Sequence, residues 1–173
     1  MSELLPKRKN PRLSQFDYSS PGAYFITICT KDKKQMLSNI VGAIHESPET
    51  KLTEFGKIVE HAVKRVPTRY NVILDRYVIM PNHIHLIIVI TENGFQRAIR
   101  ESPLRSPTIS KMVGFIKMTS SKEIHEQFGY TEIWQRSFHD HIIRDRWDYA
   151  QIARYIAENP LRWTDDCFYP TET

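Results

Sequence analysis

The sequence predicts an α+β fold, in which an antiparallel sheet carries helices on one face. Three observations support this class. Several short segments are rich in β-branched and aromatic residues, as strands are. Two longer segments repeat apolar residues every three or four positions, which is typical of helices. A Met-Pro-Asn turn joins two of the strand-like segments directly.

The first half of the chain contains three predicted strands and one helix. Residues 23–29 read as a strand because aromatic and β-branched side chains dominate them. Residues 53–66 have helical apolar spacing, with Thr53 as a candidate cap and Pro67 as the end. Residues 71–79 and 83–90 are predicted to form an antiparallel hairpin through the turn at 80–82.

The second half adds two helices and a strand. Residues 91–107 are polar and contain two prolines, so they are predicted to be a loop. Residues 108–128 should form a helix, 133–143 a short strand, and 146–158 a helix capped by Asp145. The resulting order predicts a ferredoxin-like (RRM-like) antiparallel sheet with an added C-terminal helix.

Composition sets the broad class. The chain has 173 residues, is 40% hydrophobic and 25% charged, and carries a net charge of +4, which fits one globular domain. The mildly basic charge suits a polyanion partner without requiring one. No apolar run has the length of a membrane span, no signal peptide is visible, and Cys29 and Cys167 suggest reduced thiols. We therefore expect a cytoplasmic protein without a membrane partner.

The N-terminal segment is basic and flanked by prolines. Residues 1–20 are predicted to be an arm, followed by a domain at 21–165 and a tail at 166–173. The arm would either follow a phosphate backbone or remain a solvated end. Its cations are Lys7, Arg8, Lys9 and Arg12.

Two histidines begin the most apolar predicted strand. Because successive side chains of a strand point to opposite faces, His83 and His85 share one face, while the alternating Ile84 and Leu86 point into a core. Two imidazoles in phase can hold one metal ion or one phosphate. A strand that merely carries two polar residues near its end is the alternative, but the apolar context favours a metal site.

The last predicted helix offers a reactive group. Tyr155 and Asn159 lie four residues apart, so they share a helical face. A phenol at the edge of the buried stripe could react, and an amide oxygen is a hard ligand for a divalent cation. Taken singly, each residue fits ordinary packing at a helix rim or helix end equally well.

These motifs together resemble the REP-associated tyrosine transposases, a branch of the single-tyrosine HUH nucleases related to the smallest insertion-sequence transposases. The likeness runs from about Tyr24 to Trp163. It is carried by the Met-Pro-Asn-His-Ile-His segment at 80–85, by residues 133–138 and 141–144, and by Tyr-x-x-x-Asn-Pro at 155–160. The combination is specific, whereas His-x-His alone is weak.

The resemblance implies a metal-dependent endonuclease and strand transferase that acts on single-stranded DNA beside a hairpin or palindrome. By position, Tyr155 corresponds to the nucleophile that forms a 5′-phosphotyrosine, and His83, His85 and Asn159 to the ligands of Mg²⁺ or Mn²⁺. The resemblance also implies a nucleoid-associated protein that is a monomer or a homodimer. Further contacts to the DNA backbone are expected from a dispersed set of side chains. This set is Lys111, Lys117, Arg136, His141 and Arg144.

Two other functions remain open from the residues alone. A zinc hydrolase would use His83, His85 and His141 around an activated water. A ferredoxin-like module would bind single-stranded nucleic acid on its sheet without catalysis. The hydrolase predicts that activity survives loss of the Tyr155 hydroxyl, and the binding module predicts no cleavage at all.

Overall fold

The computed structural model describes residues 20–42, 49–93 and 108–169. It contains a four-stranded antiparallel sheet with the order β4-β5-β1-β6. The strands are β1 (Gly22–Cys29), β4 (Ile73–Ile79), β5 (His83–Ile90) and β6 (His139–Ile143). With α1 between β1 and β4 and α4 between β5 and β6, the connectivity is that of the predicted ferredoxin-like fold.

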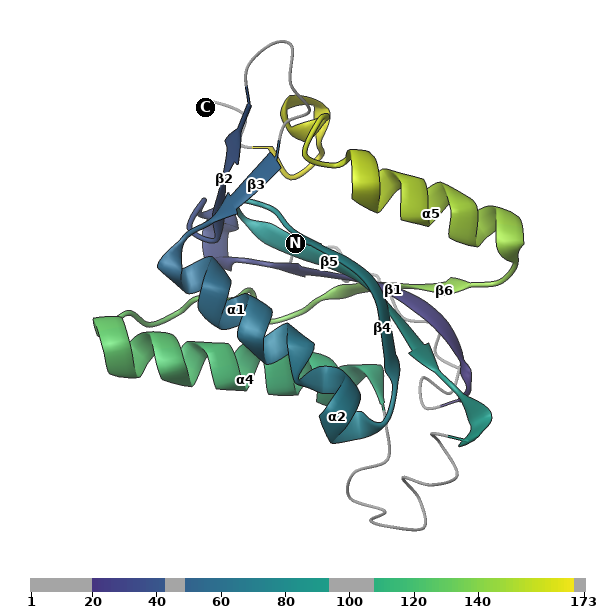
Figure 1. Ribbon diagram of the computed structural model, residues 1–173. Coiled ribbons are helices and arrows are strands. Elements are labelled where there is room, and N and C mark those ends of the chain that lie inside the picture. The colour runs from purple at the N-terminus through teal and green to yellow at the C-terminus, as the bar shows by residue number, and fades with distance from the viewer. Residues whose placement is uncertain (1–19, 43–48, 94–107, 170–173) are drawn as a thin grey trace, which may run out of the picture.

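The helices lie on both sides of this sheet (Figure 1). Helices α1 (Glu54–Lys64), α2 (Val66–Tyr70) and α4 (Ile109–Phe128) cover one face, and α5 (Arg146–Glu158) crosses the other. Two short 3₁₀ turns are η1 (Lys31–Lys33), which follows β1, and η3 (Trp163–Asp165), which follows α5. None of the helices in the described ranges has both the length and the apolar composition needed to cross a bilayer.

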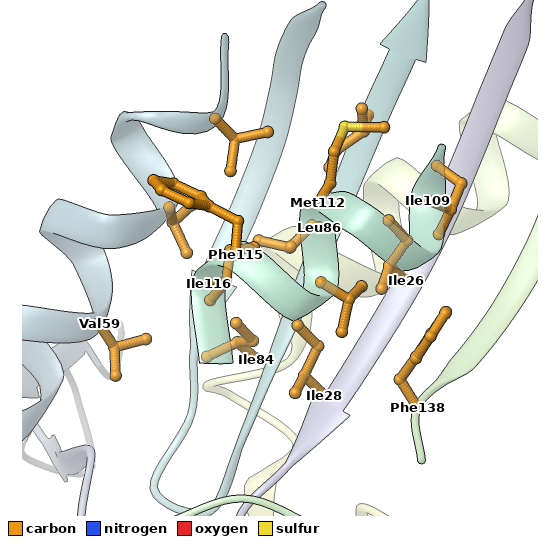
Figure 2. Close-up of a cluster of buried hydrophobic side chains, with 14 of the residues drawn as sticks. Ile26, Ile28, Val59, Ile84, Leu86, Ile109, Met112, Phe115, Ile116 and Phe138 are labelled. Atoms are coloured by element: carbon orange, nitrogen blue, oxygen red, sulfur yellow. The ribbon is translucent and has the colours of Figure 1, made fainter. Parts of the chain in front are cut away.

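The core fills the space between the sheet and the helices α1 and α4. Figure 2 shows Ile84 and Leu86 of β5 and Ile26 and Ile28 of β1 facing Met112 and its neighbours on α4. All of these side chains are fully buried. Alternation along β5 therefore sends the remaining side chains, which include both histidines, to the face under α5.

The caps confirm three predicted helix starts. Thr53 Oγ1 accepts a hydrogen bond from Gly56 N (3.1 Å), and Thr108 Oγ1 accepts one from Lys111 N (3.2 Å). Asp145 Oδ1 accepts one from Asp148 N (2.8 Å). Each satisfies a backbone donor that has no partner within its helix.

Three predicted boundaries were wrong. Pro67 does not end the helical segment but lies in the first turn of a second helix, α2. A proline is tolerated there because the backbone nitrogens of the first turn have no partner within the helix. Asn71 takes a left-handed conformation (φ 52°), so β4 starts at Ile73. Of the strand predicted at 133–143, only 139–143 pairs with β1, apart from an isolated bridge between Trp134 and Thr30.

A second, two-stranded sheet was not predicted. It pairs β2 (Ser38–Val41) with β3 (Glu49–Leu52). The strands have four residues each and alternate little in hydrophobicity, so they give almost no local signal. This hairpin leads the chain from the end of β1 into α1.

Candidate active site

The histidine pair lies at the start of β5, in the interior of the sheet. Cys29 of β1 pairs with His83, and Thr27 pairs with His85. The two Nε2 atoms lie 3.0 Å apart, so both imidazoles point toward one place in front of the sheet. Both rings are buried, at 0% and 1% exposure.

The outer ring nitrogens are held by neighbouring side chains. Asn82 Oδ1 lies 2.8 Å from His83 Nδ1, and Thr27 Oγ1 lies 2.8 Å from His85 Nδ1. The Asn82 amide nitrogen donates to the main-chain oxygens of Lys33 (3.2 Å) and Phe168 (2.8 Å), which leaves Oδ1 as an acceptor. His83 Nδ1–H therefore donates to Asn82, and the Nε2 lone pair of His83 faces the site.

The same logic assigns His85. In a metal-free chain its Nε2–H donates to His83 Nε2, and its Nδ1 accepts from the Thr27 hydroxyl. Because a hydroxyl can also accept, His85 can move its proton to Nδ1 and free the second Nε2 lone pair. Thr27 thus lets both imidazoles become ligands without moving either ring.

Helix α5 brings Tyr155 over this pair. The Tyr155 ring lies edge-on to the ring of His85, with centroids 5.2 Å apart, and to the ring of Phe25 at 6.2 Å. The side chain is 38% exposed, so it is accessible from solvent. One turn later, Asn159 is buried at the end of the helix.

Asp166 joins the groups on α5 to the histidine pair. Its Oδ2 accepts hydrogen bonds from the Tyr155 hydroxyl (3.1 Å) and the Asn159 amide nitrogen (2.8 Å), while its Oδ1 accepts from Phe168 N (2.7 Å). Ligand atoms of His83, His85 and Asp166 all lie within 4.8 Å of one another. These three residues form a cluster that could hold a metal ion.

An unsatisfied oxygen supports that interpretation. Asn159 Oδ1 is buried and has no hydrogen-bond partner. Burying a polar atom without a partner costs about 1–3 kcal/mol, so such atoms need an explanation. The amide nitrogen of Asn159 lies 2.8 Å from Asp166 Oδ2, so the side chain adjoins the cluster, and a cation held there within reach of Oδ1 would provide one. Two nitrogens with two hard oxygens are a common donor set for a divalent metal.

Electrostatics differ between the parts of the site. Burial lowers the pKa of both imidazoles below the ordinary histidine value, and Asp166 opposes this effect at His83. Burial, and then the neighbouring Asp166 carboxylate, raise the pKa of the Tyr155 phenol well above its usual value. Without a cation, the site therefore holds neutral imidazoles and a protonated phenol.

The C-terminal segment covers the imidazoles. The Phe168 ring lies over His83, with centroids 4.6 Å apart, and Lys33 Nζ donates to Cys167 O (3.1 Å). Residues 166–169, which belong to the tail predicted at 166–173, thus form one wall of the site. A cavity of about 230 Å³ opens beside them and is lined by Tyr155, Glu158, Asn159, Arg162, Asp165, Asp166 and Cys167.

The predicted DNA contacts are scattered. His141 Nε2 lies 2.8 Å from Asp148 Oδ2 on α5, and Arg144 is exposed just before that helix. Arg136 is exposed at the histidine end of the sheet, where Gln135 N donates to Cys29 O. Lys111 is exposed near the start of α4, on the far side of the sheet. Lys7, Arg8, Lys9 and Arg12 lie outside the described residues.

Lys117 is already engaged within the protein. Its ammonium group donates to the main-chain oxygens of Gln135 (2.7 Å) and Ser137 (2.9 Å), and burial lowers its pKa to about 8. These bonds hold the loop before β6, and the predicted contact of Lys117 with DNA stays a prediction. His141, the third ligand of the zinc-hydrolase alternative, pairs with Asp148 and is not part of the His83–His85–Asp166 cluster.

Sequence reasoning missed three residues of this site. Asn82 was visible as part of the turn before His83, but its contact to Nδ1 required coordinates. Thr27 required the register of β1 against β5. Asp166 lies beyond Pro160 and η3, and no local pattern indicates that the chain returns to the site there.

Comparison with known proteins identifies the family of the chain. The family model described as "Transposase IS200 like" matches residues 20–159. A Haemophilus influenzae protein named "Uncharacterized protein" is 33% identical over 94% of this chain and 93% of its own length. The Escherichia coli REP-associated tyrosine transposase is 22% identical over 84% of this chain and 70% of its own.

A solved structure shares the fold. It is titled as the REP-associated tyrosine transposase bound to a REP hairpin, and it matches 88% of this chain and 74% of its own with a TM-score of 0.61 at 22% identity. The family match covers most of the described domain, from the start of β1 to Asn159. This chain therefore belongs to the IS200-like transposase family, and REP-associated tyrosine transposases are among its homologues.

Proposed function

We propose that this chain is a metal-dependent nuclease and strand transferase that acts on single-stranded DNA next to a hairpin. The observation that carries the proposal is the meeting of two elements: the Tyr155 phenol of α5 lies beside the paired imidazoles of β5, linked through Asp166. A nucleophile and a cation cluster at one point are what phosphodiester transfer requires.

His83, His85, Asp166 and Asn159 Oδ1 are the groups that would hold the cation, and their mixed nitrogen and oxygen character suits Mg²⁺ or Mn²⁺. When bound, such an ion acts as a Lewis acid and neutralises charge at the scissile phosphate. The imidazoles need no deprotonation at neutral pH, because burial lowers their pKa. The Asn82 and Thr27 contacts hold the rings in the orientation that ligation needs.

Tyr155 performs the covalent step. Its Oη attacks the phosphorus in line, a P–O bond to the tyrosine forms, and the bond to the 3′ oxygen breaks. The phenolic proton, which is hydrogen-bonded to Asp166 Oδ2, leaves to water, and the departing 3′ oxygen takes a proton from water. The 5′-phosphotyrosine keeps the energy of the phosphodiester, so a second 3′ hydroxyl can reverse the step and regenerate tyrosine.

The test is the formation of a covalent adduct. Hairpin DNA with a single-stranded flank is incubated with the protein in Mn²⁺ or in EDTA, and denaturing gels detect protein attached to DNA. We expect an adduct only with Mn²⁺ and none with Tyr155→Phe. Tyr149→Phe is the matched control, because this tyrosine lies on the same helix but donates to Asp75 (2.7 Å) away from the site.

Other outcomes identify the alternatives. Cleavage without an adduct that survives Tyr155→Phe would support a hydrolase. Binding that needs no metal and produces no cleavage would support a nucleic-acid-binding module. If Tyr149→Phe abolishes the adduct and Tyr155→Phe retains it, the assignment of Tyr155 as the nucleophile is wrong.

A further inference from the structure

The helix that carries Tyr155 also carries an exposed tryptophan. Trp147, in the first turn of α5, is 71% exposed, whereas Trp163 is 7% exposed. An indole left in water forgoes a large hydrophobic gain, so a solvent-facing tryptophan commonly marks a binding surface. Among the residues that the structure describes, none forms a hydrogen bond or a ring contact with this indole.

The position of Trp147 relative to Tyr155 is defined by helix geometry. Eight residues separate them, which corresponds to about 12 Å along the axis and roughly 80° around it. Gln151 lies between them on the same face. A groove of about 500 Å³ follows this face and is lined by Gln151, Ile152, Arg154, Tyr155, Glu158 and Arg162. The groove therefore leads from the phenol toward the turn of the helix that holds Trp147.

The surroundings of Trp147 favour a nucleic acid over a protein partner. Arg144 and Arg146 are exposed beside it, and neither side chain forms an ion pair with any described residue. Asp148, the nearest acid on the helix, is paired with His141. Trp147 and Tyr155 are the large exposed hydrophobic residues of α5, so this face lacks the contiguous apolar patch of a protein interface.

We propose that Trp147 is a stacking platform for an unpaired nucleobase of the DNA strand whose phosphate is held at Tyr155. This inference rests on the proposed function, because it takes the occupant of the groove to be single-stranded DNA. The base stacks on the indole, while Arg144 and Arg146 contact the phosphates on either side. Trp147 thereby fixes the position of the strand relative to the nucleophile.

The test measures binding without cleavage. A fluorescent hairpin with a single-stranded flank is titrated with protein in EDTA, and anisotropy gives the dissociation constant. Trp147→Ala should weaken binding roughly 5- to 100-fold, and Trp147→Phe should restore most of it, since any aromatic ring can stack. Met118→Ala is the control, because Met118 is also exposed (64%) but lies on α4, across the sheet.

Abasic sites in the flank locate the stacked base. At one position an abasic substitution should weaken wild-type binding about as much as Trp147→Ala does, and the two changes together should add little. Unchanged affinity in Trp147→Ala, or full additivity at every flank position, would overturn the platform. So would loss of affinity that follows dissociation of a dimer in analytical ultracentrifugation.

The outcome is separable from that of the proposed function. If wild-type protein forms no adduct in Mn²⁺ but Trp147→Ala weakens binding to the flank, the platform stands and the nuclease assignment fails. If the adduct forms and Trp147→Ala binds the flank normally, the nuclease assignment stands and the platform fails.

Discussion

Gly56 provides the sharpest test of the packing between α1 and Leu37, the residue directly before β2. An added Cβ at Gly56 would lie 1.9 Å from Leu37 O and 3.3 Å from Leu52 Cβ. Cβ atoms are essentially never found within 3.0 Å of another atom, so Gly56→Ala requires a shift of about 1.1 Å (3.0 − 1.9). The obstacle is a backbone carbonyl and cannot rotate away.

The expected cost combines two destabilising effects and one partly offsetting gain. Overpacking of this kind costs about 1–3 kcal/mol. The shift also disturbs Leu37 O, which accepts from Thr53 N (3.0 Å) and Thr53 Oγ1 (3.0 Å), and each weakened bond costs about 1 kcal/mol. Replacing a helical glycine by alanine adds about 1 kcal/mol to the free energy of unfolding, because alanine has the higher helix propensity. We expect Gly56→Ala to lower the free energy of unfolding by about 2–4 kcal/mol.

Gly114→Ala is the matched control, since an added Cβ at this exposed position of α4 meets nothing within 4 Å. The control should gain about 0.5–1 kcal/mol from helix propensity. Urea unfolding gives both free energies, and thermal unfolding should show Gly56→Ala lower in Tm by roughly 5–12 °C. Equal or higher stability of Gly56→Ala would refute the close approach of α1 to Leu37.

Three further predictions concern the site. In EDTA, the free energy of unfolding of the wild type should fall more steeply from pH 7 to pH 5 than that of His83→Gln. The pKa of the folded His83 imidazole is lowered, so the unfolded chain takes up a proton at higher pH than the folded chain does. Equal slopes in urea unfolding across this pH range would contradict the prediction. Asn82→Ala should lower Mn²⁺ affinity in calorimetry by about 10- to 100-fold, because His83 Nδ1–H loses its acceptor, while Asn39→Ala on β2 should not. Asp166→Asn should reduce the rise in Tm caused by Mn²⁺, and exposed Asp165→Asn should leave it; the reverse order would remove Asp166 from the cluster.

The sequence predicted the parts of the molecule in which the local pattern and the fold agree. The β4–β5 hairpin, the helices capped by Thr53 and Asp145, and the four-stranded sheet all follow from periodicity, caps and turn residues. The order of elements then limits how the strands can be arranged, because crossover connections have a fixed hand. The fold class therefore required no long-range information.

The rest depended on contacts between distant segments. The β2–β3 hairpin is held against the body of the domain by bonds such as Ser38 Oγ to Ile79 O (2.9 Å), which no local pattern reports. The conformation of Asn71 and the start of β6 also reflect packing rather than propensity. At the site, His83 and His85 were predictable as a pair sharing one face, whereas Asp166 reaches them only through the path of the chain after Pro160.

The candidate site is divided between two elements that differ strongly in how much of each is buried. β5 is hydrogen-bonded on both edges and buried along almost its entire length, whereas α5 buries Ile156 alone among its thirteen residues. Local opening costs least where little apolar surface is buried. Amide protons of β5 should consequently exchange with deuterated solvent more slowly than those of α5, by orders of magnitude. The strand that carries the histidine pair is then the rigid part of the site, and the helix that carries Tyr155 is the part that can move.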